Sequence, residues 1–386
     1  MTEREFCIAV NMISGVGFLR YSSLLDTFGS PDEVRKAERG VLQKVDGIGP
    51  VLAERIISFD WDAELSREFA VAERGGVQII TLVDEDYPDE LRNIYDPPLC
   101  LYVRGKLPEK HDRSIAIVGS RRISRYGEKM AVMLAEEAVA CGFTVYSGLA
   151  LGVDTLAHKA VVDMAGCTVG VLGGGLMHMY PKENIPLARD MIRNGGAVIS
   201  EFPLNFPVNR HNFPRRNRIV AAMCRAVIVV EAGLDSGALI TAKLAAEMGK
   251  EVFALPGRVD NVQAKGCHKL IKEGACLIEN FDDVMLVLAT GLRPGMENMT
   301  TGEIVGSEQM SPDCEKVCTL LSGGDMDLEE LQMATAWEPG MLMAVLMKLE
   351  LLLAVERDSF GYYHLTGSRK KEPCAETPEL DMDCQS

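Results

Sequence analysis

The chain of 386 residues contains no long hydrophobic run. None of its apolar stretches approaches the roughly 20 residues that a membrane-spanning helix needs. Residues 1–10 mix acidic and basic side chains and lack the apolar core that a secretory leader carries. We therefore expect a soluble, cytoplasmic protein.

Two signatures of bound cofactors are also missing. The eleven cysteines are scattered singly, and the closest pair, Cys314 and Cys318, has no neighbouring His or Cys that would complete a zinc set. The loop Gly119-Ser120-Arg121 follows a predicted strand but does not continue as the Gly-x-Gly-x-x-Gly that binds dinucleotides. We therefore expect no metal and no cofactor.

Basic side chains are scarcer than acidic ones. The chain has 40 Lys and Arg against 56 Asp and Glu, and its formal net charge is -16. Residues 291–386 hold 7 Lys and Arg against 18 Asp and Glu, so much of the acidity lies in the C-terminal quarter. Nucleic-acid binding responds to local charge rather than to the sum, so the excess of acid does not exclude it.

One segment departs from this acidity. Residues 212–219 read Asn-Phe-Pro-Arg-Arg-Asn-Arg-Ile, with three arginines in four residues and no acid. The apolar run 219–222 that follows predicts the first turn of a helix. Guanidinium groups beside a helix N-terminus favour an anion, and arginine binds phosphate oxygens in a bidentate manner. The segment predicts an anion site, and a solvated loop is the alternative.

Apolar strand-like runs alternate with helical patterns from Ile115 onward. This alternation predicts βαβ units and a mostly parallel, doubly wound α/β sheet. The predicted strands are 115–118, 143–146, 168–172, 197–200, 226–230 and 251–254. Most of these strands run into glycine-containing loops, at the sheet edge where such folds bind ligands.

Composition divides the chain into five segments. Residues 1–75 read as short helices joined by glycine turns, similar to a helix-hairpin-helix or SAM-like domain, although such turns can also serve only to pack helices. Residues 76–290 hold the α/β pattern, and 291–311 read as a polar linker. Three helices and a hairpin in 312–367 resemble a winged helix, and the polar tail 368–386 is expected to be disordered.

The strand-end loops together resemble the DprA/Smf family of DNA-processing proteins, from about Asp84 to Phe281. The motifs that carry the resemblance are Ala116-Ile117-Val118-Gly119-Ser120-Arg121, Ser147-Gly148, Gly152-Val153-Asp154, Tyr180-Pro181 with Asn184, Ser200-Glu201-Phe202-Pro203, Asn212 to Arg218, Glu231-Ala232, Ser236-Gly237, Pro256-Gly257 and Gly266-Cys267. Four positions depart from the usual family pattern, namely Met177, Asn205, Ala238 and His268.

The resemblance implies an extended Rossmann-like fold and a function without catalysis. Proteins of this family bind single-stranded DNA, form homodimers and help to load the RecA recombinase onto DNA during homologous recombination and natural transformation. We therefore expect single-stranded DNA, RecA and a second copy of the chain as partners, and no membrane.

The same loops predict the residues that hold DNA. They are Gly119, Ser120, Arg121, Lys182, Asn212, Phe213, Arg215, Arg216, Asn217, Arg218, Ser236 and Gly237. The five cations would contact phosphates, which predicts a slope of log K against log salt of roughly -3.5. Backbone amides of the glycines and serines would surround phosphate oxygens.

Several of these residues have a structural alternative. Phe213 would stack on a base or plug the core, and Asn217 would bond DNA or its own backbone. Asp154 and His158 stand four residues apart, a spacing that also suits an acid-base pair, but we assign Asp154 to a helix N-terminus and His158 to a structural contact. We therefore predict no catalytic residue.

Two other functions remain open. LOG-type phosphoribohydrolases have a related Rossmann-like fold and would release a free base from a nucleotide, but the loop from Glu231 to Gly237 lacks their Pro-Gly-Gly-x-Gly-Thr pattern. An adaptor whose acidic C-terminal part binds a protein partner is the third possibility.

Overall fold

The computed structural model describes residues 1–108, 113–289, 312–351, 354–357 and 362–365. The chain divides into two compact units, Met1–Leu292 and Arg293–Ser386. The predicted linker 291–311, the predicted polar tail 368–386 and residues 358–361 of the predicted hairpin lie outside the described residues.

Nine strands form one sheet in the larger unit. They are β1 Gln78–Thr81, β2 Cys100–Gly105, β3 Ser114–Val118, β4 Thr144–Ser147, β5 Thr168–Val171, β6 Ala197–Ser200, β7 Ala226–Val229, β8 Glu251–Ala254 and β9 Cys276–Leu277. Their order is β1-β2-β6-β5-β4-β3-β7-β8-β9. The seven strands from β6 to β9 are parallel, whereas β2 pairs antiparallel with β6 and with β1. The predicted mostly parallel sheet is confirmed.

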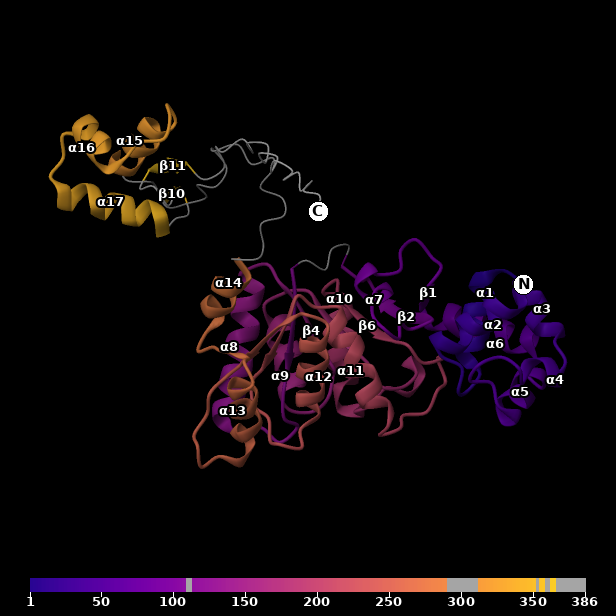
Figure 1. Ribbon diagram of the computed structural model, residues 1–386. Coiled ribbons are helices and arrows are strands. Elements are labelled where there is room, and N and C mark those ends of the chain that lie inside the picture. Colours follow the sequence, from indigo (N-terminus) through magenta and orange to yellow (C-terminus); the bar gives the residue numbers. More distant parts are fainter. Residues whose placement is uncertain (109–112, 290–311, 352–353, 358–361, 366–386) are drawn as a thin grey trace, which may run out of the picture. The chain divides into compact units, whose positions relative to one another are not determined.

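Helices cover both faces of this sheet (Figure 1). They are α7 Asp89–Arg92, α8 Arg125–Ala140, α9 Val153–Asp163, α10 Ile185–Arg193, α11 Asn212–Ala222, α12 Gly237–Glu247, α13 Lys265–Lys272 and α14 Phe281–Ala289. Successive residues of a strand point to opposite faces. Ile115 and Ile117 of β3 therefore pack with α8, α9 and α14, while Ala116 and Val118 pack with α11, α12 and α13.

The path of the chain creates a crevice beside β3. From β3 the chain steps outward through β4, β5 and β6, and it then returns to the other side of β3 to form β7 and β8. The loops that follow β3 and β7 consequently leave the sheet in opposite directions. Open α/β sheets bind ligands at this switch point, outside the carboxyl ends of the strands.

Six helices precede the sheet and share a hydrophobic core with it (Figure 1). They are α1 Glu3–Met12, α2 Phe18–Phe28, α3 Pro31–Lys36, α4 Arg39–Leu42, α5 Pro50–Ile57 and α6 Trp61–Gly75. The rings of Phe6 and Trp61 stack at 5.8 Å, and both belong to the cluster that contains Tyr102 of β2. Glu68 of α6 accepts a 2.8 Å hydrogen bond from the amide of Leu204, which fixes α6 to the loop after β6.

The smaller unit contains three helices and a two-stranded antiparallel sheet. Its elements are α15 Pro312–Leu321, α16 Leu328–Thr335, α17 Pro339–Leu351, β10 Val355–Arg357 and β11 Tyr363–Leu365. Cys314, Leu331, Leu346 and Tyr363 belong to its core. Over the described part of both units, no helix has the length and hydrophobicity that crossing a membrane requires.

The helix that carries the arginines begins earlier than predicted. The sequence pattern placed its first turn at residues 219–222, but α11 starts at Asn212, about two turns before. Pro214 falls in the first turn, where the backbone N–H has no acceptor within the helix, so proline does not interrupt it. The arginines therefore lie inside the helix and point in different directions.

Candidate nucleic-acid interface

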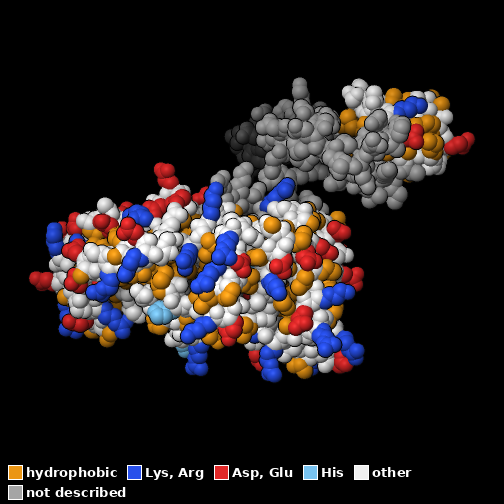
Figure 2. All heavy atoms as spheres, turned by 180° about the vertical axis from the view of Figure 1, so that it is seen from behind, with side chains coloured by type: hydrophobic (Ala, Val, Ile, Leu, Met, Phe, Trp, Pro, Cys, Tyr) orange, Lys and Arg blue, Asp and Glu red, His pale blue; other side chains and the backbone are white. Residues whose placement is uncertain are grey.

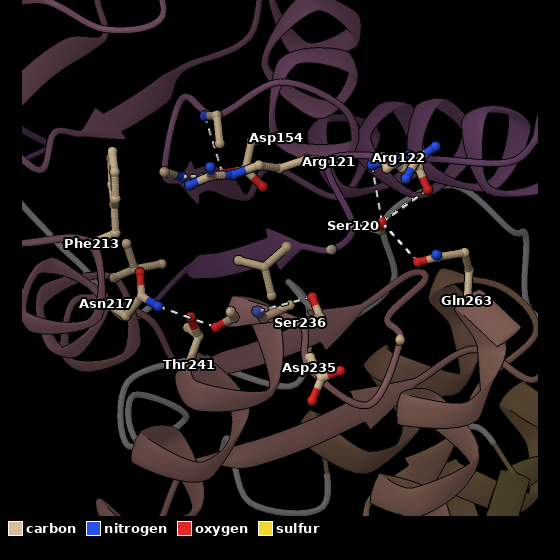
Figure 3. A pocket seen from close by; sticks show the side chains of 18 of the residues that line it. Ser120, Arg121, Arg122, Asp154, Phe213, Asn217, Asp235, Ser236, Thr241 and Gln263 are labelled. Atoms are coloured by element: carbon tan, nitrogen blue, oxygen red, sulfur yellow. Dashed lines mark hydrogen bonds between the residues drawn. The ribbon is translucent and has the colours of Figure 1, made fainter. Parts of the chain in front are cut away.

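A pocket of about 560 Å³ opens at the switch point. Its walls come from the loop after β3, from α11, from the first turn of α12 and from the short 3-10 helix η3, Val262–Ala264. Figure 3 shows Phe213 and Asn217 on one side of the pocket and Ser120 and Gln263 on the other. The pocket therefore occupies the crevice that the sheet topology predicts.

Hydrogen bonds to the loop after β7 and to η3 hold the loop after β3 in place. The amide of Ser120 donates to the Glu231 carbonyl at 2.6 Å, and its hydroxyl contacts Gln263 at 3.1 Å (Figure 3). The buried Glu231 carboxylate accepts from the amide of Ser124 at 2.9 Å and from Asn261 at 3.0 Å. This network leaves the Arg121 side chain exposed at the rim of the pocket.

Arg216 lines the same pocket but is buried. Its Nη1 donates to the Val171 carbonyl, and its guanidinium lies so close to Gly148 that a Cβ there would meet Nη1 at 2.2 Å. Burial lowers the pKa of Arg216 to about 10, against the opposing effect of Asp154, so the group stays charged at neutral pH. Its Nε is buried and has no hydrogen-bond partner among the described residues. The pocket therefore contains an incompletely paired cation.

Asp154 and His158 fix the backbone near Arg216 through hydrogen bonds to the loop after β4 and to β5. Asp154 lies in the first turn of α9, as expected, and accepts from the amides of Gly148 at 3.0 Å and Ala150 at 3.3 Å. Burial raises the pKa of Asp154, and Arg216 opposes this shift. His158 pairs with Thr168 at 2.7 Å, and burial lowers the pKa of His158 to about 3. These contacts and pKa shifts indicate a structural role for both side chains rather than a role in proton transfer.

The N-terminus of α12 forms the opposite wall. Ser236 is its N-cap and accepts from the amide of Ala238 at 3.3 Å, while Asn217 donates to the Gly237 carbonyl at 3.2 Å. The amide of Ser236 already donates to the Gly233 carbonyl at 3.1 Å. Since the Ser120 amide is engaged as well, the predicted set of free serine amides is not formed. The amide of Gly237, the first helical residue, and the positive end of the helix remain for an anion.

Arg215 and Arg218 lie outside the pocket lining and face an acid. Both guanidinium groups contact the same oxygen of the buried Glu201, at 2.9 Å from Arg215 and 2.7 Å from Arg218. Arg218 also contacts Asp96 at 3.4 Å. Each helical residue turns the side chain by about 100°, so neighbouring arginines reach different surroundings. Only Arg216 of the three enters the pocket.

A second, smaller cavity of about 30 Å³ adjoins the first and shares Arg121 and Phe213 with it. Tyr180 also lines it, beside η2, which spans Lys182–Asn184 and follows η1 at Leu176–His178. Lys182 itself is exposed. Phe213 is half-buried, and the Arg121 guanidinium lies over its ring at 5.0 Å from the centroid.

Eight of the twelve predicted residues line the larger pocket, namely Gly119, Ser120, Arg121, Phe213, Arg216, Asn217, Ser236 and Gly237. The four outside its lining are Lys182, Asn212, Arg215 and Arg218. Prediction missed other lining residues, among them Arg122, Asp235, Thr241, Val262 and Gln263. Arg122 could have been predicted, because it follows Arg121 in the same strand-end loop. Val262 and Gln263 could not, because they lie on η3, which follows no predicted strand directly.

One face of the larger unit carries both signs of charge. Figure 2 shows basic and acidic side chains spread over the same face of the larger unit, with apolar side chains between them. On this face, attraction of a polyanion therefore has to depend on local groups rather than on a broad basic field.

The comparisons with known proteins agree with the fold and the motifs. Residues 78–289 match the family model described as DNA recombination-mediator protein A. Protein Smf of Escherichia coli is 41% identical over 240 residues, which cover 62% of this chain and 64% of that protein. Protein Smf of Synechocystis is 31% identical over 388 residues, which cover 92% of this chain and 97% of that protein.

A solved structure shows the same similarity. The X-ray structure of DNA processing protein A (DprA) from Streptococcus pneumoniae matches with a TM-score of 0.63 and 34% identity, over 74% of this chain and 98% of that one. The resemblance inferred from the strand-end motifs is thus confirmed. The chain belongs to the DNA recombination-mediator protein A family, in which the Smf and DprA proteins are its relatives.

Proposed function

We propose that this protein binds single-stranded DNA in the pocket at the switch point. The observation that carries the proposal is Arg216, a buried cation that lines the pocket and whose Nε has no partner among the described residues. A backbone phosphate in the pocket supplies a countercharge to this guanidinium group, and Arg121 and the N-terminus of α12 add further attraction. The family description, DNA recombination-mediator protein A, supports DNA as the ligand.

The test is binding of the full chain to a fluorescent single-stranded oligonucleotide and to its duplex. We expect the single strand to bind more tightly, and the Arg121→Ala variant to lose on the order of tenfold in affinity because a charge-assisted contact is removed. Arg193→Ala is the matched control, since this exposed arginine pairs with Asp190 at the end of α10. Equal binding by Arg121→Ala and wild type would reject the site.

We propose that the site binds without catalysis. The buried acids nearest to the pocket are already engaged: Asp154 accepts two backbone amides, and Glu231 accepts from Ser124 and Asn261. A neutral, buried His158 is a poor proton carrier. Incubation with nucleoside monophosphates should release no free base, and enzyme-dependent release would establish the phosphoribohydrolase alternative.

We also propose, from family membership, that the protein acts in the cytoplasm as a homodimer and helps to load RecA onto single strands during recombination or transformation. The description of the family as a recombination mediator supports this role. Recovery of RecA's DNA-dependent ATPase on strands coated with single-strand-binding protein tests it, and sedimentation tests the dimer. No recovery at any concentration would contradict the loading role.

We also propose which type of domain each segment flanking the α/β domain forms. Three helices followed by an antiparallel pair support a winged helix in 312–367. In residues 1–75, Arg20 donates to the Gly47 carbonyl at 2.9 Å and also to that of Gly15, which ties two glycine turns together and supports a helix-hairpin-helix-like domain. The α/β domain then spans residues 76–290.

A further inference from the structure

Tyr180 presents an exposed aromatic ring beside the phosphate pocket. It lies between η1 and η2, in the loop that follows β5, and 53% of the residue is exposed. It lines the small cavity together with Arg121, Phe213 and Leu151, and Leu151 is 44% exposed. Among the ring pairs and hydrogen bonds of the described residues, none involves the Tyr180 side chain. These contacts therefore do not explain the ring as a support of the fold.

Phe213 is the other aromatic ring that lines the small cavity, but it already packs against neighbouring residues. The Arg121 guanidinium lies over its ring, 5.0 Å from the centroid. The backbone of Gly173 approaches the ring so closely that a Cβ on Gly173 would lie 2.8 Å from Cδ1. These contacts make Phe213 a support for Arg121, and they leave Tyr180 as the more accessible ring.

We propose that Tyr180 is a stacking platform for an unpaired nucleobase. This inference rests on the proposed function and specifies how the site recognises its ligand. The two cavities share Arg121, Gly148, Ala150 and Phe213, so a base stacked on the exposed Tyr180 ring would lie next to a phosphate in the larger cavity. The exposed Lys182 lies two residues further along the chain.

This placement explains a preference for single strands. An aromatic ring can stack on any base, because every base has a π-face, and it therefore binds with little sequence preference. A base inside a duplex is stacked on its neighbours and paired with its partner. It reaches Tyr180 only after unstacking, which costs free energy.

The test compares wild type, Tyr180→Ala and Tyr180→Phe on an oligothymidylate and on an abasic oligonucleotide of equal length. We expect Tyr180→Ala to bind the oligothymidylate on the order of tenfold more weakly, and Tyr180→Phe to bind it as wild type does. All three proteins should bind the abasic strand equally. Tyr95→Ala is the control, because Tyr95 is 84% exposed and lines neither cavity.

The outcomes separate this inference from the proposed function. If wild type binds the oligothymidylate and Tyr180→Ala binds it equally well, or loses as much affinity for the abasic strand, base stacking on Tyr180 is rejected while the phosphate site stands. If wild type binds neither strand, the proposed function itself fails. A 2-aminopurine placed within the strand gives a direct readout, since stacking quenches its fluorescence in wild type and Tyr180→Ala should restore it.

Discussion

At the scale of single residues, the difference between Arg216 and Arg218 lies in their partners. Both are buried on α11, but Arg218 has Glu201 at 2.7 Å and Asp96 at 3.4 Å. Each leaves one buried nitrogen without a partner among the described residues, Nε of Arg216 and Nη1 of Arg218, but Arg216 has a carbonyl partner and the field of Asp154 in place of ion pairs like those of Arg218. Burying a charge without full pairing is costly, and an incoming phosphate reduces that cost. The sequence showed three equivalent arginines, because it does not reveal which acids face them.

Gly148→Ala tests the position of Arg216. The added Cβ would lie 2.2 Å from Nη1, and the buried guanidinium has to move. We expect single-strand affinity to fall at least tenfold and the free energy of unfolding to fall by about 1–3 kcal/mol. Fluorescence anisotropy and urea unfolding measure the two effects. Gly40→Ala is the control, since a Cβ there meets nothing within 4 Å, and unchanged DNA binding by Gly148→Ala would contradict the role of Arg216.

At the scale of helices and strands, all six predicted strands were correct because short apolar runs bounded by glycine are typical of a buried parallel sheet. The strands β1, β2 and β9, at the two ends of the strand order, were missed, since they lie outside that alternation or contain only two residues. The start of α11 was missed because the prediction rested on the apolar run 219–222 alone, whereas the helix already begins at Asn212 and accommodates Pro214 in its first turn. Strand-end loops therefore located the pocket from sequence alone, but helix geometry decided which side chains enter it.

The contact between α9 and β5 predicts a pH effect on stability. Burial lowers the pKa of His158 on α9 to about 3 in the folded state, below the ordinary histidine value of 6.5. The unfolded chain binds a proton between these values and the folded chain does not, so stability is complete above pH 6.5 and is lost as pH falls. From this group we expect about 2 kcal/mol less stability at pH 5 than at pH 7.

Urea unfolding of wild type and His158→Gln at both pH values checks this expectation. The variant cannot take up the proton, so its loss between pH 7 and pH 5 should be smaller by that amount. The raised pKa of Asp154 acts in the opposite direction, but it is present in both proteins and cancels in the comparison. Equal losses in the two proteins would show that His158 does not titrate as its burial implies.

At the scale of the whole molecule, few charges remain for DNA on a chain of net charge -16. Arg215 and Arg218 are compensated by Glu201, which leaves Arg121, Arg216 and Lys182 of the five predicted cations. Three contacts predict a slope of log K against log salt near -2 instead of -3.5. Measured between 50 and 200 mM salt, Arg121→Ala should make the slope shallower by about 0.7, while Arg215→Ala should leave it unchanged. A shallower slope for Arg215→Ala would show that this arginine leaves Glu201 for DNA.

The acidic C-terminal part provides the last test of where DNA binds. Met1–Leu292 is compact and has its own cores, and it holds every residue assigned to the pocket. A chain ending at Leu292 should therefore bind the single strand within about threefold of the full chain at 150 mM salt, where charges beyond about 8 Å are largely screened. At low salt it should bind more tightly, because 18 acids and only 7 bases lie in residues 291–386. Loss of binding at both salt concentrations would assign the DNA contact, or its control, to the smaller unit and favour the adaptor function.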